Sequence, residues 1–307
     1  MRGIISRFAP APTGFLHLGH IVNAIHVWGV ARARRGAVLL RLEDHDRQRS
    51  RLQYERAILD DLAWLGFAAD EGPVRQSDRG DIYLQALETL RAQGLVYACS
   101  CSRGDVTADG ARRPQPSEGR RDREPGRPAP QTELRYPGTC RDRGIPERAG
   151  VGLRVRLVPS VERFTDRRLG PQEQRPHDQC GDLLVRDRDG NWTYQFAAAV
   201  DDFVQGVTHV IRGEDLLAST GRQIQLARLL GRHEPPAFLH HVLILKSDGR
   251  KLSKSAGDSG IRDLRAKRWP AARVIGHAAF RAGLISADRD VCAAEVSSII
   301  PRHEVGP

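Results

Sequence analysis

Two histidines lie close together near the start of the chain, in the stretch RFAPAPTGFLHLGH that covers residues 7–20. His17 and His20 flank Gly19 and follow a proline-rich turn. Imidazole N–H groups at the beginning of a helix can donate to phosphate oxygens, and the helix dipole attracts anions to the same place. The same spacing also suits two histidines on a partly buried helix face. The motif alone leaves both interpretations open.

Lysine is rare in this chain, and two of its lysines lie within four positions. Only 4 of the 48 basic residues are lysine, and the stretch KLSKS at residues 251–255 contains two of them, Lys251 and Lys254. An ammonium group is a compact charge on a flexible stem, whereas a guanidinium is a rigid fork. We therefore expect these two lysines to contact phosphates. A solvated surface loop is the alternative.

Three cysteines have a spacing that favours a metal site. Cys99 and Cys101 form a C-x-C pair, and Cys140 follows Tyr136 by four positions. Thiolates from two chain segments could supply most of a tetrahedral zinc site. The total of five cysteines is odd, which does not favour a full set of disulfides. Unligated thiols are the alternative, because this spacing is less specific than paired C-x-x-C motifs.

Hydrophobic periodicity predicts alternating strands and helices in the first third of the chain. The predicted strands are residues 3–8 and 37–44, and the predicted helices are residues 17–36, 52–67 and 79–95. This alternation is typical of a doubly wound nucleotide-binding fold with a parallel sheet. In such a fold His17 and His20 begin the helix after the first strand, where ligand phosphates bind.

The middle of the chain departs from this pattern. Residues 103–131 are rich in proline, glycine and charge, which predicts a flexible segment. Alternation returns at residues 151–159, and residues 181–202 are predicted as a strand, an Asp-Gly turn and then a strand or a helix. Residues 205–231 are predicted as a strand and a helix that begins near Ser219 and Thr220. A last helix is predicted at residues 269–284.

Composition limits the classes of protein to which the chain can belong. The net charge of +10 and the pI of about 9.9 favour a polyanionic partner without identifying it. A length of 307 residues suits one large domain with an insertion, or two domains. No stretch approaches the roughly 20 apolar residues of a membrane span, and the first residues lack the apolar region of a secretory leader. We expect a cytoplasmic protein.

The two motifs, APTGFLHLGH and KLSKS, occur in this order and far apart, and the chain thereby resembles the class I aminoacyl-tRNA synthetases. The stretches RFAPAPTG, LRLEDHDR, TYQFAAAVDD, GVTHVIRGEDLL and GRKLSKS resemble the glutamyl branch of that family. The resemblance covers about residues 3–285. Few residues follow KLSKS, which leaves no room for the large anticodon-binding domain of a full glutamyl-tRNA synthetase. The chain is therefore similar to the glutamyl-queuosine tRNA(Asp) synthetases.

The resemblance implies a ligase that activates L-glutamate with ATP and Mg²⁺ to glutamyl-adenylate. It then transfers glutamate to the queuosine base in the anticodon of tRNA(Asp). A truncated glutamyl-tRNA synthetase that charges tRNA(Glu) and a non-catalytic RNA-binding paralogue are the alternatives. We expect a monomer.

The resemblance also implies an α/β fold: a class I synthetase Rossmann-like parallel sheet with an inserted zinc-containing acceptor-type subdomain and a short helical C-terminal region. The expected boundaries are 1–97 for the first half of the nucleotide-binding domain and 98–190 for the insertion, with a flexible loop at 103–131. Residues 191–257 are expected to form the second half with the KLSKS loop, and 258–307 the C-terminal region.

The family pattern assigns residues to each part of the site. The resemblance implies that the catalytic residues are His17, His20, Lys251 and Lys254. It implies that the residues binding ATP are His17, Gly19, His20 and Lys254. Gly19 is expected to leave room for the nucleotide. The L-glutamate site comprises Arg7, Phe8, Ala9, Pro10, Ala11, Glu43, Tyr194 and Arg212. Glu43 is expected to meet the ammonium, and the arginines suit the carboxylates. Which arginine takes the side-chain carboxylate stays open.

Simpler roles remain for some of these residues. Arg7 and Glu43 could pair with each other, and Tyr194 could be an ordinary core residue. The family's zinc ligands fall on Cys99, Cys101, Tyr136 and Cys140. We expect this zinc to be structural, since a full set of protein ligands leaves little room for a catalytic water.

Overall fold

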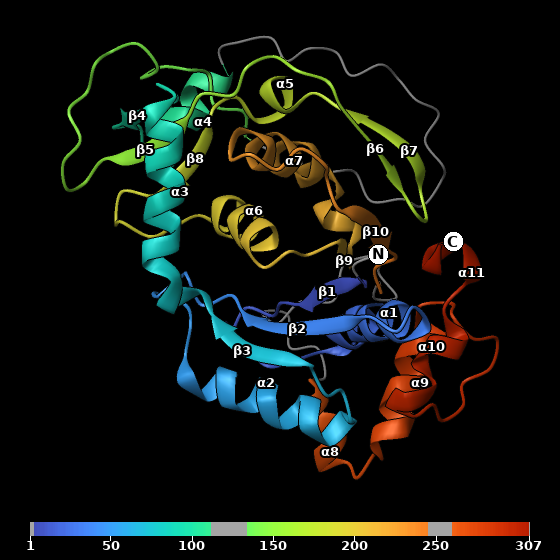
Figure 1. The fold of residues 1–307 in the computed structure, drawn as a ribbon. Helices are drawn as coiled ribbons and strands as arrows, with labels where there is room; N and C mark the ends of the chain where they lie inside the picture. Colours follow the sequence, from blue (N-terminus) through green and yellow to red (C-terminus); the bar gives the residue numbers. More distant parts are fainter. Residues whose placement is uncertain (1–2, 112–133, 245–259, 307) are drawn as a thin grey trace.

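The computed structural model describes residues 3–111, 134–244 and 260–306, and a parallel sheet lies at its centre (Figure 1). On one side, β1 (Ile5–Phe8), β2 (Ala37–Leu42) and β3 (Glu71–Arg75) pair in parallel. On the other, β9 (His209–Gly213), β10 (Ala237–His241) and β6 (Glu162–Asp166) do the same, and β7 (Gly170–Gln174) adds an antiparallel edge.

Thr208 joins these two sets of strands. Its backbone N–H donates to the Ile5 carbonyl at 2.9 Å, and the Ile5 N–H donates to its hydroxyl at 2.9 Å. The strand order therefore reverses between β1 and β9. In open α/β sheets, ligands bind outside the carboxyl ends of the strands at such a reversal.

The helices around the sheet explain why its strands are so apolar. Strand β2, with the sequence AVLLRL, is buried at five of its six positions because both faces of the sheet are covered. Helix α1 (Leu18–Ala33) packs on β1, β2 and β9 and is itself covered by α9 (Ala271–Arg281) and α10 (Val296–Ile299). Helices α2 (Leu52–Leu65) and α6 (Tyr194–Val204) lie on opposite sides of the sheet (Figure 1).

A second, antiparallel sheet lies at one end of the molecule (Figure 1). It consists of β4 (Val96–Cys99), β5 (Gly152–Val155) and β8 (Leu183–Arg186), and it shares an apolar core with α3 (Gly80–Ala92) and α6. The remaining helical segments are α4 (Arg103–Ala111), α5 (Pro176–Cys180), α7 (Thr220–Leu229), α8 (Ile261–Ala266), α11 (Arg302–Val305), η1 (Gln76–Arg79), η2 (Glu214–Ser219) and η4 (Ala293–Glu295).

The structure confirms most of the predicted elements. The open choice at residues 194–202 resolves to a helix, α6, and the helix predicted to begin near Ser219 is α7. The prediction of a flexible segment at 103–131 is wrong for its first nine residues, which form α4, and residues 112–131 lie outside the described residues. The β6–β7 hairpin pairs with β10 of the central sheet, although the predicted boundary assigns it to the insertion. The domain boundaries stay a prediction.

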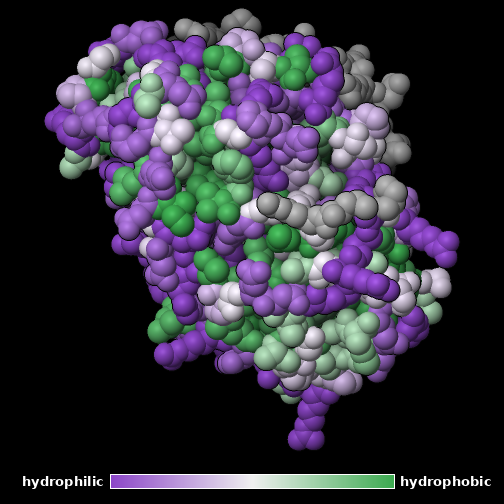
Figure 2. All heavy atoms as spheres, viewed as in Figure 1, coloured by the Kyte–Doolittle hydropathy of each residue, from purple (hydrophilic) through white to green (hydrophobic). Residues whose placement is uncertain are grey.

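Hydrophilic residues predominate on the face shown in Figure 2, and hydrophobic residues gather there in smaller patches. Within the described ranges, no helix is both long enough and apolar enough to span a membrane.

Candidate active site

His17 and His20 form the beginning of helix α1. His17 is the N-cap residue, and its Nδ1 accepts the Gly19 N–H at 3.1 Å, while the Nδ1 of His20 accepts the His17 N–H at 3.1 Å. The two ring centroids are 3.9 Å apart. Because each Nδ1 accepts a hydrogen bond, each neutral ring carries its proton on Nε2. The capping geometry thus selects the tautomer that has an Nε2–H donor.

Gly19 is required by His17 in this arrangement. A Cβ atom at position 19 would lie 2.9 Å from Cε1 of His17, so any side chain would displace the capping imidazole. Glycine at position 19 therefore has a structural role besides the predicted one of leaving room for a nucleotide: it leaves room for the His17 imidazole.

The segment that holds Lys251 and Lys254 lies outside the described residues, which stop at 244 and resume at 260. At the point where they resume, Gly260 forms an isolated antiparallel bridge with His17, and the Ile261 N–H donates to the Leu16 carbonyl at 2.9 Å. The C-terminal flank of the lysine segment is therefore anchored beside the histidine motif.

Arg7, Glu43, Tyr194 and Arg212 come together at the reversal between β1 and β9. Burial raises the pKa of the Tyr194 phenol, and the charge of Glu43 raises it further, while Arg212 and Arg7 oppose them. These side chains come from β1, the end of β2, the first turn of α6 and β9. Tyr194 thus interacts with Glu43, Arg212 and Arg7, and the role of these residues in binding L-glutamate stays a prediction.

Arg7 pairs with Asp202 rather than with Glu43. The Arg7 Nε lies 2.9 Å from Oδ1 of Asp202, and NH1 of Arg41 lies 2.8 Å from the same oxygen. Glu43 instead lies 3.4 Å from NH2 of Arg41. Burial raises the pKa of the Glu43 carboxyl, and the charges of Arg41 and Arg7 partly oppose this effect.

The short segment from Phe8 to Ala11 connects these groups. The Phe8 side chain is buried and packs on Trp28, with ring centroids 5.3 Å apart, so only its backbone could face a ligand. The Pro10 carbonyl accepts the Glu43 N–H at 3.1 Å, which fixes the segment against the end of β2. Ala9 and Ala11 are half-buried.

Arg212 differs from Arg7 in its surroundings. It is 3% exposed, and burial lowers its pKa. It donates hydrogen bonds to Nε2 of His240, Oε1 of Gln223 and Oγ1 of Thr220. A further side-chain hydrogen bond joins it to Tyr194. Within the described part of the chain, no acidic side chain forms an ion pair with Arg212. A buried cation of this kind can receive a carboxylate from a ligand.

The sequence analysis missed a buried network behind the site. Arg41 is fully buried and contacts Glu43, Asp201 and Asp202. Asp201 also accepts hydrogen bonds from Gln76, Arg79 and Tyr83. The sequence did contain a signal for this network, because Arg41 is a charged residue inside the apolar strand AVLLRL. A charge in a strand that is covered on both faces must have a partner of opposite charge or a hydrogen-bond acceptor.

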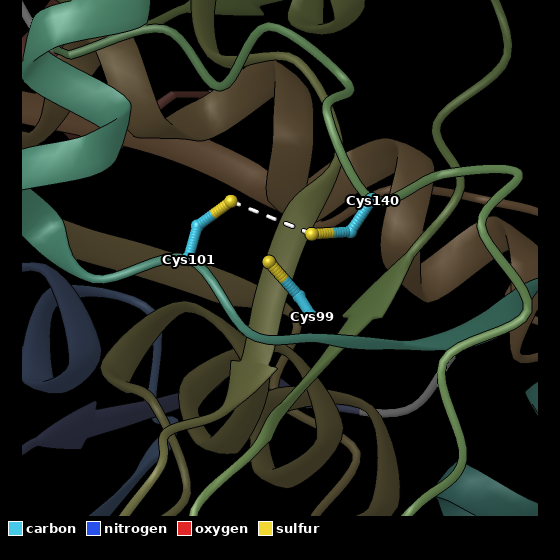
Figure 3. Close-up of side chains that lie close together, drawn as sticks. All are labelled: Cys99, Cys101 and Cys140. Atoms are coloured by element: carbon cyan, nitrogen blue, oxygen red, sulfur yellow. Dashed lines mark hydrogen bonds between the residues drawn. The ribbon is translucent and has the colours of Figure 1, made fainter.

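Cys99, Cys101 and Cys140 converge from two segments (Figure 3). Their sulfur atoms all lie within 4.8 Å of one another, and Cys101 and Cys140 are 3.4 Å apart. The phenol oxygen of Tyr136 lies 3.5 Å from the Cys99 sulfur and accepts the Cys140 N–H at 2.8 Å. Zinc–sulfur bonds of about 2.3 Å place tetrahedral sulfurs about 3.8 Å apart, so the cluster fits this ion.

The surroundings of the cysteines favour the thiolate form of one of them, Cys140. Burial opposes ionisation of Cys140, but hydrogen bonds from Cys101, Ser100 and Tyr136 outweigh it and lower its pKa to about 6. Arg154 is buried, donates from Nε to the Cys99 sulfur at 3.3 Å, and lies 3.6 Å above the centre of the Tyr136 ring. This arginine therefore contacts two of the four predicted ligands.

The chain is similar to known proteins over most of its length. The model of the family "tRNA synthetases class I (E and Q), catalytic domain" matches residues 3–298. The chain is 40% identical over 296 residues to the glutamyl-Q tRNA(Asp) synthetase of Albidiferax ferrireducens, covering 89% of this chain and 92% of that protein. It is 45% identical over 255 residues to the enzyme of the same name from Bordetella bronchiseptica, covering 82% and 75%.

Among solved structures, the glutamate-tRNA synthetase of Elizabethkingia anophelis superposes with a TM-score of 0.77 at 25% identity. The match covers 99% of this chain and 66% of that synthetase, so the chain spans about two thirds of its length.

Proposed function

The chain belongs to the class I tRNA synthetase (E and Q) catalytic-domain family, and on that premise we propose that it activates L-glutamate with ATP and transfers glutamate to queuosine in the anticodon of tRNA(Asp). The observation that carries this proposal is a buried arginine, Arg212, whose hydrogen-bond partners are neutral, in a chain whose relatives at 40–45% identity are named glutamyl-Q tRNA(Asp) synthetases. The glutamate-tRNA synthetase fold supports the choice of amino acid.

The residues at the strand reversal divide the recognition of glutamate among them. Glutamate has one ammonium and two carboxylates. Glu43 meets the ammonium, because a buried carboxyl whose pKa is raised gains from an added cation. Arg212 meets the side-chain carboxylate, since its protein partners are neutral, and the backbone from Arg7 to Ala11 borders the amino-acid end. This assignment is our proposal for the question that the sequence left open about the two arginines.

The histidine and lysine motifs act on ATP, which binds with Mg²⁺ as a substrate. The α-carboxylate of glutamate attacks the α-phosphorus, and pyrophosphate leaves, so the protein needs to position the reactants and stabilise charge rather than supply a nucleophile. His17 and His20 donate from Nε2 to phosphate oxygens. Lys254, with Lys251, meets the departing pyrophosphate, and what supports this proposal is that Gly260, six residues after Lys254, pairs with His17.

A structural zinc ion belongs to the same proposal. Cys99, Cys101 and Cys140, with Tyr136 as the fourth ligand, would hold it, and the ion would crosslink the end of β4 to the loop before β5. Gly181 helps to place that loop: its φ is +68°, and a Cβ there would lie 2.1 Å from the Tyr136 carbonyl. The proposed zinc-bearing insertion is residues 98–190.

The test is a charging assay with labelled glutamate. We expect the label on tRNA(Asp) that carries queuosine and none on tRNA(Glu), and we expect the charging to survive removal of the 3′-terminal adenosine. Glutamate-dependent exchange of pyrophosphate with ATP should proceed without tRNA. Charging of tRNA(Glu) that is abolished by loss of its 3′ adenosine would decide for an ordinary glutamyl-tRNA synthetase, and complete inactivity in both assays would decide for an RNA-binding paralogue.

A further inference from the structure

His240 makes the hydrogen bond that accounts for the position of the Arg212 guanidinium along strand β9. The Arg212 Nε donates to Nε2 of His240 at 3.1 Å across the β9–β10 pair, where the two residues are in register. The Thr220 hydroxyl lies 3.2 Å from the same Nε2 and also accepts from NH2 of Arg212 at 2.9 Å. The imidazole is fully buried, so water does not replace these contacts.

Asp166 fixes which nitrogen of His240 is free to accept. Its Oδ2 lies 2.7 Å from Nδ1 of His240 and accepts the backbone N–H of the same residue at 3.0 Å. The other oxygen, Oδ1, accepts the N–H groups of Arg168 and Leu169. A carboxylate can only accept, so Nδ1 carries the proton and Nε2 of the neutral ring is an acceptor. Asp166 is thus held at both oxygens and in turn holds the tautomer.

We propose that His240, oriented by Asp166, is a positioning residue that holds Arg212 for the side-chain carboxylate of the amino acid without neutralising its charge. This inference rests on the proposed function. A carboxylate in the place of His240 would hold Arg212 equally well, but it would pair with the guanidinium and compete with the substrate. A neutral acceptor fixes the geometry and leaves the positive charge available.

Gln223, another neutral partner of Arg212, is also held by a further side chain. The Gln223 carbonyl oxygen accepts from Arg212 NH1 at 2.6 Å, and the amide of Gln223 donates to Gln195 at 2.9 Å. Gln195 donates in turn to the Ser219 hydroxyl at 2.8 Å. His240 and Gln223, two of the neutral groups that contact Arg212, are therefore each oriented by a further group behind them. This arrangement favours glutamate over glutamine, because only an anion offsets the charge of the buried guanidinium.

Two substitutions of His240 separate this role from simple packing. In His240→Asn the short amide can keep the hydrogen bond to Asp166, but it cannot reach Arg212. In His240→Gln the longer side chain can offer a carbonyl oxygen to Arg212, but it loses the bond to Asp166. We expect the asparagine variant to raise KM for glutamate by about tenfold to a hundredfold, as for one lost hydrogen bond to a charged group. KM for ATP should change little, and the preference for glutamate over glutamine should fall.

The glutamine variant should recover most of the affinity for L-glutamate, and calorimetric titration with L-glutamate gives a readout that does not depend on turnover. His209→Asn is the matched control, because His209 also accepts from an arginine, Arg167, but at the opposite end of β9. It should leave KM for glutamate unchanged. If His240→Asn and His240→Gln raise KM for glutamate equally, or if His240→Gln raises it more, the inference is overturned. Absence of glutamate-dependent exchange in the unsubstituted enzyme would instead overturn the proposed function.

Discussion

Asp202→Asn tests how much the buried ion network contributes to stability. Burial raises the pKa of the Asp202 carboxyl, but Arg7 and Arg41 outweigh this effect and hold the pKa at about 2, below its ordinary 3.8. A difference of this size between the folded and unfolded chain corresponds to about 2.5 kcal/mol of folding free energy at neutral pH. Breaking a buried pair leaves uncompensated charge and costs about 3–5 kcal/mol. We expect a loss of about 3 kcal/mol.

The assay is urea unfolding of both proteins at a series of pH values. Because the folded-state pKa of Asp202 is depressed, its contribution is complete above pH 3.8 and is lost as the pH falls towards 2. The difference in unfolding free energy between wild type and Asp202→Asn should therefore stay constant from about pH 8 to about pH 5 and shrink below about pH 4.

Asp142→Asn is the matched control. Asp142 also pairs with an arginine, Arg156, at 2.9 Å, but its side chain is 81% exposed. An exposed pair of this kind should contribute less than about 1 kcal/mol. Equal losses in the two variants, or a difference for Asp202→Asn that stays constant in acid, would refute the reasoning.

Three further predictions concern the zinc site and the lysine segment. Metal analysis should find about one zinc per chain in the wild type and in Cys292→Ser, and Cys140→Ser should lose it; unchanged metal content in Cys140→Ser would contradict the site. Arg154→Met should weaken zinc retention against a chelator by about tenfold or more, because side chains that hydrogen-bond to metal ligands contribute on this scale. Arg156→Met is the control, because it removes a neighbouring arginine that does not contact the sulfurs. The Lys254→Arg variant should keep its stability but lose most glutamate-dependent pyrophosphate exchange, because the rigid guanidinium of arginine is a poor substitute for the ammonium of lysine. Near-normal exchange in this variant would contradict the inference that lysine is required at position 254.

Local patterns in the sequence were sufficient to predict the elements that carry the site. The apolar run at residues 37–42 and the helical spacing after His17 correspond to β2 and α1. The motifs also predicted that Arg7, Glu43, Tyr194 and Arg212 would meet, and that three cysteines would converge. The predicted elements are confirmed because burial and helical periodicity are properties of short segments, whereas the proximity of residues from different segments followed only from the family resemblance.

Partners that are distant in sequence could not be predicted. Asp202 binds Arg7 and Arg41 from more than 160 residues away, and Asp166 orients His240 across 74 positions. No periodicity encodes such pairs, and only the strand order brings them together. Strands β3 and β6 escaped prediction for another reason: EGPVR and ERFTD are short and polar, so their sequences lack the apolar character of a central strand.

The charges at the strand reversal complement glutamate in number as well as in position. Arg7 and Arg212 supply two positive charges near Tyr194, and Arg41 supplies a third where it pairs with Glu43 and Asp202, which supply two negative charges. Asp201 contacts both Arg41 and Arg79, and counting it together with Arg79 adds one charge of each sign, which leaves the balance unchanged. The site thus holds one positive charge in excess, and glutamate, with two carboxylates and one ammonium, holds one negative charge in excess. Glutamine carries no net charge, so its binding would leave Arg212 buried and uncompensated. The neutral histidine and glutamine partners of Arg212 are what preserve this excess, because a single acidic side chain in either position would remove it.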